Sequence, residues 1–178
     1  TGYIDFNIEH GLAKKADGTD GEFIVYLDGS EAYATDNTIT IEGQHSFSNK
    51  DSTIYGGYLA YNKDIGYKPE IYDVFTGNTL NYANRTPISI KEIGNFQTYN
   101  FTLSPELGNT GTALIHAETV NLGANSDNIS DGSTTASDIY VTGIHSGKVI
   151  STSTEFILMK GDSLEGEGTG HITNDVKQ

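Results

Sequence analysis

The sequence contains no cysteine and no tryptophan, and it has only 3 prolines and 1 methionine among 178 residues. Without cysteine, the chain has no disulfide scaffold, no thiolate zinc site and no cysteine nucleophile. No stretch approaches the roughly 20 apolar residues of a membrane-spanning helix. The segment Thr1–Glu9 alternates polar and apolar residues, which is not the pattern of a secretory signal peptide. We therefore expect no membrane insertion by this chain.

Basic residues are also scarce. The chain has 10 Lys and Arg against 24 Asp and Glu, which gives a formal net charge of −14. Nucleic acids and anionic membrane surfaces both require clustered positive charge on the protein. The composition therefore excludes nucleic acid as a partner, and a charge of this size favours solubility.

The residues that are abundant indicate strands. There are 21 Gly, 11 Tyr and 7 Phe, and the apolar positions recur at period two, with Gly or Asn interrupting every longer run. In GNFQTYNFTLSP the alternation of Tyr99, Phe101 and Leu103 predicts a strand, while Phe96 lies out of register and predicts a bend at residues 97–98. We expect strands at Tyr3–Ile8, Glu22–Leu27, Thr38–Glu42, Thr53–Tyr61, Ile71–Phe75, Thr79–Tyr82, Ile88–Ile93, Tyr99–Leu103, Ala113–Leu122, Ile139–Thr142, Lys148–Ser151 and Glu155–Met159. The fold class is all-β.

Two features favour a parallel β-solenoid over a sandwich or barrel. The chain has no Asn-Gly dipeptide, the strongest signal of a two-residue hairpin, although Asp-Gly occurs four times. The segment Asn37–Ile41 echoes Asn78–Tyr82, since both read Asn-Thr followed by an apolar–polar–apolar triplet. Stacked turns would place like residues in ladders, and roughly seven to nine short turns would fit this length. A β-sandwich remains the alternative architecture.

Three stretches resemble a known family. They are Asp73–Tyr82, Ile93–Pro105, and Gly111–Ile115 together with the later Thr154–Gly161. In this order they resemble the C-terminal part of the passenger domain of Gram-negative autotransporter proteins. In that family a GNTL strand precedes an NF…YNF.LP strand, a GDT.L segment and a closing VTLI strand. The resemblance covers residues 71–161, and the IYGGY string within Ser52–Tyr58 matches the style of such proteins.

The resemblance implies a right-handed parallel β-helix that is extracellular, displayed on the bacterial surface or released from it. Residues 1–178 would form a single domain, a fragment of a longer passenger. Its function would be adhesion or self-association, without catalysis or cofactor, and its partner a host-cell surface protein or glycan, or another copy. Two alternatives stay open: a secreted carbohydrate-active β-helix enzyme of the polysaccharide lyase or hydrolase type, and a β-sandwich binding module.

Residues that suggest catalysis occur in isolation. The string Gly161–Leu164 reads GDSL, the nucleophile motif of an esterase family, but His171 lacks the Asp three positions earlier that the family's base requires. We therefore predict no imidazole within hydrogen-bonding reach of the Ser163 hydroxyl. His116 and Glu118 share one face of a strand. That face also carries apolar residues, which favours a buried or edge pair over a site.

Metal sites are not expected either. The five histidines never occur as HxH or HExxH. The segment Asn125–Gly132 is rich in oxygen donors, but Ile129 breaks the alternating pattern of a calcium loop, so we interpret it as a solvated loop. The basic residues are scattered, which disfavours a lyase site.

The candidate binding face is aromatic. Tyr55, Tyr58, Tyr61, Tyr67 and Tyr72 fall within eighteen residues, and Tyr82 and Tyr99 are expected to stack above or below them. Tyrosine combines apolar area with a polar tip, which suits sugar or protein contacts, although tyrosine also favours strands for packing reasons alone. A bend at Gly56-Gly57 is required for Tyr55, Tyr58 and Tyr61 all to point outward.

Overall fold

The computed structural model describes residues 25–59 and 67–172, and this part of the chain is built from β-strands. Its one helical element is a short 3₁₀ helix at Pro105–Leu107. The strands are β1 Val25–Tyr33, β2 Thr38–Gly43, β3 Phe47–Tyr55, β4 Tyr67–Asp73, β5 Thr79–Asn84, β6 Ile88–Gly94, β7 Thr98–Leu103, β8 Ala113–Leu122, β9 Ser137–Ile144, β10 Ile157–Gly166 and β11 Gly168–Ile172. The predicted all-β class is confirmed.

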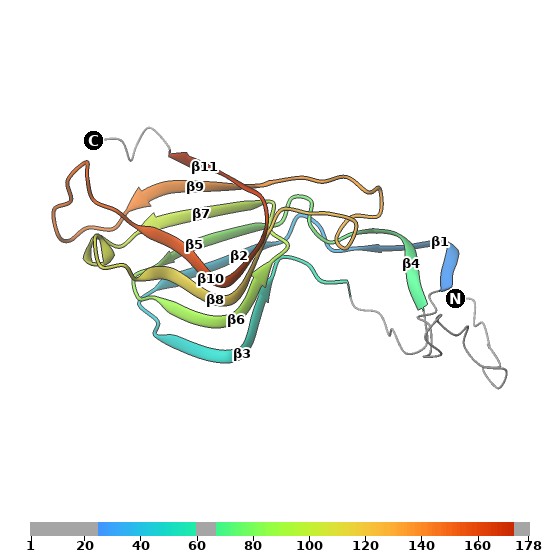
Figure 1. Ribbon diagram of the computed structural model, residues 1–178, viewed down its shortest axis with the longest axis horizontal. Helices are drawn as coiled ribbons and strands as arrows, with labels where there is room; N and C mark the ends of the chain where they lie inside the picture. The colour runs from blue at the N-terminus through green and yellow to red at the C-terminus, as the bar shows by residue number, and fades with distance from the viewer. Residues whose placement is uncertain (1–24, 60–66, 173–178) are drawn as a thin grey trace, which may run out of the picture.

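From β5 onward the chain passes back and forth between two parallel sheets (Figure 1). The first sheet has the strand order β11-β9-β7-β5-β2, and the second sheet has the order β10-β8-β6-β3. All strand pairs in both sheets are parallel. A parallel pair cannot be joined by a tight hairpin, so a sandwich made of antiparallel hairpins does not fit the described chain.

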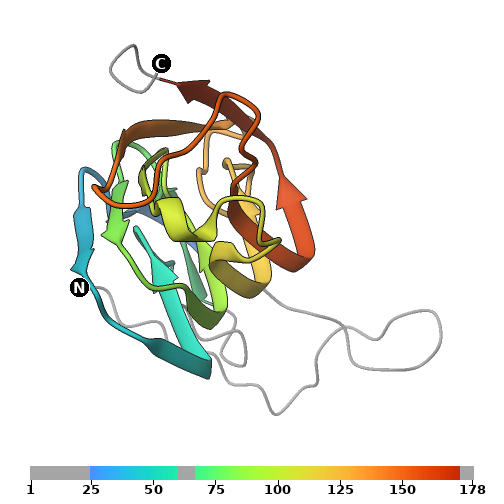
Figure 2. The ribbon, with the colours of Figure 1, turned by 90° about the vertical axis from the view of Figure 1, so that its left-hand side faces the viewer.

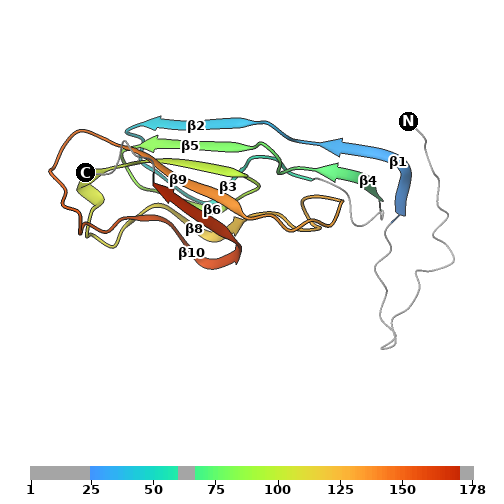
Figure 3. The same ribbon diagram turned by 90° about the horizontal axis from the view of Figure 1, so that it is seen from above.

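A third, two-stranded sheet extends from one end of the molecule. β1 and β4 pair in parallel, and they continue the lines of β2 and β5 beyond the first sheet (Figure 3). The loop at residues 124–135 lies against β4. The Ser130 N–H donates to the Tyr72 carbonyl oxygen at 2.9 Å, and the Tyr72 N–H donates to Ser130 Oγ at 2.9 Å. These bonds fix the loop over the Tyr72 side of β4.

The register of the first sheet confirms that the two Asn-Thr echoes are neighbours. β2 pairs with β5 residue for residue, with Ile39 beside Leu80 and Ile41 beside Tyr82. The strands around Leu80 and Phe101 also pair in parallel, as predicted, because β5 pairs with β7. The two inward columns are Ile39, Leu80, Tyr99, Ile139 and Gly170, and Ile41, Tyr82, Phe101, Val141 and Ile172.

The core lies between the two sheets, which Figure 2 shows almost end-on to the strands. The second sheet supplies aliphatic side chains and the first sheet supplies mostly aromatic ones. The buried members include Ile88, Ile90, Ile93, Ile115, Ala117, Val120, Leu80, Tyr82, Tyr99 and Phe101. The rings of Tyr99 and Phe101 stack with centroids 6.4 Å apart and planes 3° from parallel. Burial of each large side chain contributes about 1.5–3 kcal/mol, so the aromatic columns supply much of the stability.

Buried asparagines join the backbone where the chain turns between strands. Asn78 is 0% exposed, and its Oδ1 accepts from the Asn37 N–H at 3.0 Å. Its Nδ2 donates to the carbonyl oxygens of Ala34 and Val74, both at 2.9 Å. Asn84, at the other end of β5, also makes three hydrogen bonds to backbone groups. These amides satisfy backbone groups that no strand pairs, which accounts for part of the asparagine content.

Several predicted strand boundaries are wrong. The predicted strand at 148–151 is a loop in which Val149 is 91% exposed. The predicted strand at 53–61 begins earlier, at Phe47, and ends at Tyr55, because the chain bends at Gly56. β11 was not predicted, and residues 3–8 lie outside the described part of the chain.

The bend predicted at residues 97–98 begins two residues earlier. β6 ends at Gly94, and Asn95 takes a positive φ of 59°. This turn swings the neighbouring Phe96 into the core, where it is 0% exposed. The out-of-register phenylalanine is therefore a core residue placed by a turn.

Candidate functional site

Two tyrosines of the predicted binding face lie together at the surface. Tyr55 is the last residue of β3, and Tyr58 follows the bend at Gly56. Their rings stack with centroids 5.2 Å apart and planes 27° from parallel. Tyr58 is 64% exposed, while Tyr55 is half-buried beneath it. The outer face of Tyr58 is therefore open to a partner.

The bend that brings the rings together requires glycine at two positions. A Cβ on Gly56 would lie 2.3 Å from the Asn95 carbonyl oxygen, and a Cβ on Gly57 would lie 2.5 Å from the Val74 carbonyl oxygen. Any side chain at either position would force the backbone apart. The bend that the sequence predicted at Gly56-Gly57 is confirmed, and it places Tyr58 back over Tyr55.

A carboxylate and an amide brace the half-buried tyrosine. The Tyr55 hydroxyl donates to Glu92 Oε2, and Asn121 Nδ2 donates to Glu92 Oε1. The three residues come from the neighbouring strands β3, β6 and β8. Gly94 lies beside Tyr55 in the register, and a Cβ there would lie 2.9 Å from Asn121 Cβ. The brace therefore holds one orientation of the Tyr55 ring.

The brace also keeps the Tyr55 hydroxyl protonated. Burial raises the pKa of Tyr55, and the hydrogen bond to Glu92 and the negative charge of that carboxylate raise it further. In this arrangement the phenol proton lies between Tyr55 and the Glu92 carboxylate. The Tyr55–Tyr58 pair is suited to contact, since it offers a fixed aromatic surface with a polar rim.

Tyr72, another tyrosine of the predicted face, is not part of this surface. Tyr72 is 6% exposed, and its hydroxyl donates to the Ser126 carbonyl oxygen beneath the 124–135 loop. The prediction that Tyr72 contributes to an exposed face is therefore wrong. Tyr61 and the side chain of Tyr67 lie outside the described part of the structure.

The predicted stacking of Tyr82 and Tyr99 with the surface tyrosines is also wrong. Both rings are buried between the two sheets, at 1% and 0% exposure. The cause is the alternation of side chains along β5 and β7, which places both tyrosines on the inward face of the sheet.

The residues that suggested catalysis do not assemble into a nucleophile and base. Ser163 lies on β10 beside Thr119 of β8 and is exposed. No hydrogen bond joins Ser163 to a histidine in the described chain. His116 Nε2 instead lies 3.4 Å from Asp162 Oδ1, and both side chains are largely solvent-exposed. Glu118, on the same strand as His116, is exposed. These groups form a surface polar row.

The oxygen-rich loop uses its oxygens to hold its own turns. Asn125 Oδ1 accepts from the Asp127 N–H at 2.8 Å, and Asp131 Oδ1 accepts from the Ser133 N–H at 2.8 Å. The hydrogen bonds from Ser133 lower the pKa of Asp131. Within residues 25–59 and 67–172, no three His, Asp or Glu side chains gather as metal ligands would. The acidic loop is explained by turn chemistry.

A second surface cluster lies at the far end of the first sheet. The ring of His171 on β11 stacks on Tyr140 of β9, with centroids 4.6 Å apart and planes 19° from parallel. His171 Nε2 also lies 3.1 Å from Asp138 Oδ1. Sequence reasoning missed this cluster, because it depends on the pairing of β9 with the unpredicted β11.

Comparisons of the chain with protein-family models, with curated proteins and with solved structures find no match. In the described part of the chain, no helix has the length and apolar character needed to span a membrane.

Proposed function

We propose that residues 1–178 form a right-handed parallel β-helix belonging to the passenger of a bacterial surface autotransporter. The alternation of the chain between two parallel sheets supports a β-helix, as does the stacking of like residues in columns. The stretches that resemble the family map onto adjoining strands: β5 beside β7, and β8 beside β10. The count of roughly seven to nine turns stays a prediction.

The proposed activity is non-catalytic binding outside the cell, in adhesion or self-association. The observation that carries it is the exposed Tyr58 ring held in place over Tyr55, Glu92 and Asn121. A chain of net charge −14 gains little from attraction to anionic glycans. Neutral aromatic and hydrogen-bonding contacts suit a neutral glycan or a host-cell surface protein, or another copy of the chain. Weak contacts of this kind become effective when many copies are displayed together.

The test compares two tyrosines of similar exposure on cells that display the chain. Tyr58→Ala removes the proposed contact, and Tyr33→Ala removes a ring of 59% exposure on β1 that is not part of the Tyr55–Tyr58 stack. We expect Tyr58→Ala to weaken cell aggregation or host-cell binding, by roughly tenfold in the affinity of a single contact, and Tyr33→Ala to leave it unchanged. Circular dichroism confirms that both variants are folded. Equal adhesion of all three proteins would refute the role of this surface.

A further inference from the structure

The two ends of the strand stack both leave apolar side chains uncovered. β2 and β3 lie at one end of their sheets, and β10 and β11 lie at the other, so each has a hydrogen-bonded neighbour on one side only among the described strands (Figure 1). At the first end Phe47 is 44% exposed. At the second end Leu164 is 67% exposed and Ile172 is 60% exposed. Exposed edge strands are templates for pairing with another strand.

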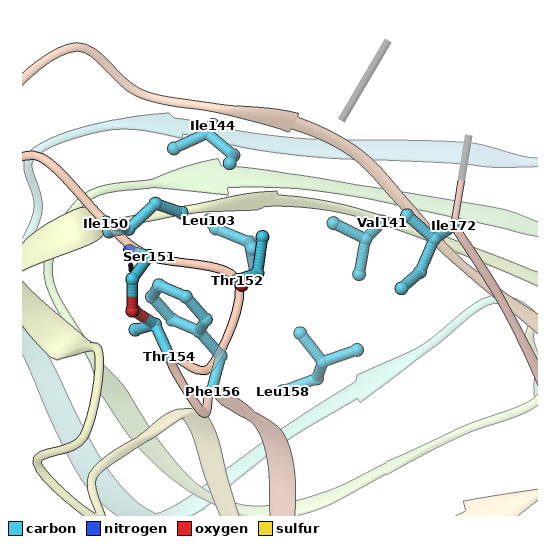
Figure 4. Close-up of a pocket in the computed structure, with 10 residues that line it drawn as sticks. All are labelled: Leu103, Val141, Ile144, Ile150, Ser151, Thr152, Thr154, Phe156, Leu158 and Ile172. Carbon is cyan, nitrogen blue, oxygen red and sulfur yellow. Dashed lines mark hydrogen bonds between the residues drawn. The ribbon is translucent and has the colours of Figure 1, made fainter. Parts of the chain in front are cut away.

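The second end also contains an open apolar cavity of about 540 Å³. Figure 4 shows the side chains around it, which come from β7, β9, β10 and β11 and from the loop before β10. The apolar lining consists of Leu103, Val141, Ile144, Ile150, Phe156, Leu158 and Ile172. This cavity continues the interior between the two sheets, so it has the shape that a further layer of inward side chains would fill.

The strand register predicts which side chains of an added layer would face this end of the molecule. In the second sheet, one column reads Phe47, Ile88, Ile115, Met159, and another reads Ile54, Ile93, Val120, Leu164. In the first sheet, one column begins at Ile41 and ends at Ile172. Each of these three columns has an apolar residue at both ends, whereas the column that begins at Ile39 ends at Gly170. A second copy placed on top with the same register would therefore set Phe47 beside Met159, Ile54 beside Leu164 and Ile41 beside Ile172.

The geometry points to head-to-tail stacking of this chain, in which β2 and β3 of one copy pair with β11 and β10 of the next. The same register that pairs strands within the molecule continues across the junction. Within the 178-residue chain a second copy is the occupant that these columns favour, because the chain itself carries both halves of the fit. Such a contact is heterologous and does not close on itself, so it generates linear chains of copies. Tyr55 is the last residue of β3, but the inference does not rest on its contact with Tyr58, because the columns that carry it start at Phe47, Ile54 and Ile41.

Charge sets the conditions for assembly. Each copy carries a net charge of −14, and copies brought together repel one another. Salt shortens the range of that repulsion to about 10 Å at 0.1 M. Assembly should therefore strengthen as the ionic strength rises, which is the opposite of what an ion-paired interface would show.

The experiment uses variants that each disable one end of the 178-residue chain. Leu164→Lys with Ile172→Lys disables the second end, and Phe47→Lys disables the first end. Ile71→Lys changes an apolar side chain of 41% exposure on β4, inside the two-stranded sheet, and serves as the control. Circular dichroism and thermal unfolding establish that each variant is folded.

Sedimentation velocity over a series of concentrations gives the result. We expect the wild type and Ile71→Lys to form a growing series of assemblies and each end variant to remain monomeric. An equimolar mixture of the two end variants should form a dimer and nothing larger, since one intact end of each remains. If Phe47→Lys unfolds the chain, the monomeric state of the second-end variant and its capping of wild-type assemblies supply the same test.

Three outcomes would overturn the inference: a wild type that stays monomeric at every concentration and salt, a closed dimer that the end variants leave intact, or assembly lost in Tyr58→Ala but kept in the end variants. The last outcome would support self-association through the tyrosine surface while rejecting stacking. Loss of adhesion in Tyr58→Ala without loss of assembly would support both proposals, so the two fail independently.

Discussion

The hydroxyl of Tyr82 donates to the carbonyl oxygen of Leu114 at 3.0 Å, and this bond joins the two sheets across the core. Tyr82 lies on β5 of the first sheet and Leu114 on β8 of the second. The same hydroxyl lies 2.9 Å from the Thr86 carbonyl oxygen. Apolar side chains fill the space between the sheets without fixing how the sheets are placed. The hydrogen bond to Leu114 does fix it, because it joins one strand of each sheet.

The buried tyrosine predicts alkaline unfolding. Burial raises the pKa of Tyr82 to about 12 from its ordinary value of 10.0, while the Asn84 side chain opposes this with a smaller effect. A folded-state pKa above the unfolded value contributes stability that is fully present below pH 10 and is lost as the pH rises towards 12. The loss from this group amounts to about 3 kcal/mol. Burial also raises the pKa of Tyr99. The stability that the neutral Tyr99 hydroxyl contributes is therefore also lost as the pH rises. Unfolding free energies from urea titrations at increasing pH would test this, and a flat profile above pH 10 would contradict it.

Two conservative substitutions separate a bonded hydroxyl from an unbonded one. Tyr82→Phe leaves the ring but removes the hydroxyl that the Leu114 and Thr86 carbonyl oxygens share, so we expect a loss of about 1–3 kcal/mol. Tyr99 is equally buried, yet its hydroxyl has no hydrogen-bond partner in the described structure. Tyr99→Phe should therefore be neutral or stabilising. Thermal and urea unfolding of the two variants would show the difference, and equal effects would contradict the assignment of the Tyr82 bond.

The tight bend at Gly56 predicts that adding one methyl group there strongly destabilises the fold. In Gly56→Ala the new Cβ would meet the Asn95 carbonyl oxygen at 2.3 Å and Asn78 Cβ at 2.7 Å. Both contacts involve groups held by the fold, so we expect destabilisation of at least about 2 kcal/mol. Gly143→Ala is the control, because its nearest contact would be Thr102 Cγ2 at an ordinary 3.7 Å. If unfolding measurements gave the two variants the same stability, the corner would be looser than its geometry indicates.

Some of this fold can be predicted from the sequence, and the reason is local. β5, β6, β7 and β8 each carry an apolar–polar alternation of their own, and the predicted ranges match the structure closely. The Asn-Thr echo was informative because its residues pair one to one between β2 and β5. In these strands the local pattern and the tertiary packing favour the same conformation.

Other strands depend on neighbours and leave little trace in the sequence. β11 reads GTGHI, with few good strand formers, and its backbone is extended because it pairs with β9. The predicted strand at 148–151 has better strand formers, but the chain there forms a loop and Ile150 lines the end cavity. A strand requires a hydrogen-bonding neighbour as well as propensity.

Only part of the candidate site could be predicted from the sequence, because the rest depends on contacts between strands that are distant in sequence. The density of tyrosines identified Tyr55 and Tyr58, and the Gly-Gly pair identified the bend. The brace by Glu92 and Asn121 depends on the register of three strands that are distant in sequence. Tyr72 belongs to the core side of β4 only because the 124–135 loop folds over it, and no periodicity within β4 reports that contact.

The last prediction exchanges a buried amide for a carboxylate. Asn84 Oδ1 accepts from the His45 N–H at 2.8 Å, while Nδ2 donates to the carbonyl oxygens of His45 at 2.8 Å and Thr86 at 2.7 Å. In Asn84→Asp at neutral pH, both donors are lost and a buried negative charge faces two carbonyl oxygens. We expect a loss of about 3–5 kcal/mol, because the buried negative charge faces two carbonyl oxygens and keeps only the His45 N–H as a donor.

The pH dependence of that variant identifies the cause. Desolvation and the two carbonyl oxygens should raise the pKa of the introduced carboxyl group above its unfolded value. Its protonated form regains one donor, so the deficit relative to wild type should shrink as the pH falls through the folded pKa and grow as the pH rises. Asn81→Asp, on the same strand, is the matched control, because Asn81 Oδ1 acts as the acceptor for Asn100 Nδ2 at 2.9 Å and a carboxylate keeps that role. Urea unfolding of both variants across acid and neutral pH supplies the measurement. The explanation would be contradicted by a stability deficit of Asn84→Asp that does not change with pH, or by an equal deficit in Asn81→Asp. Either result would show that side-chain shape, rather than the lost donors, determines the stability of the turn at Asn84.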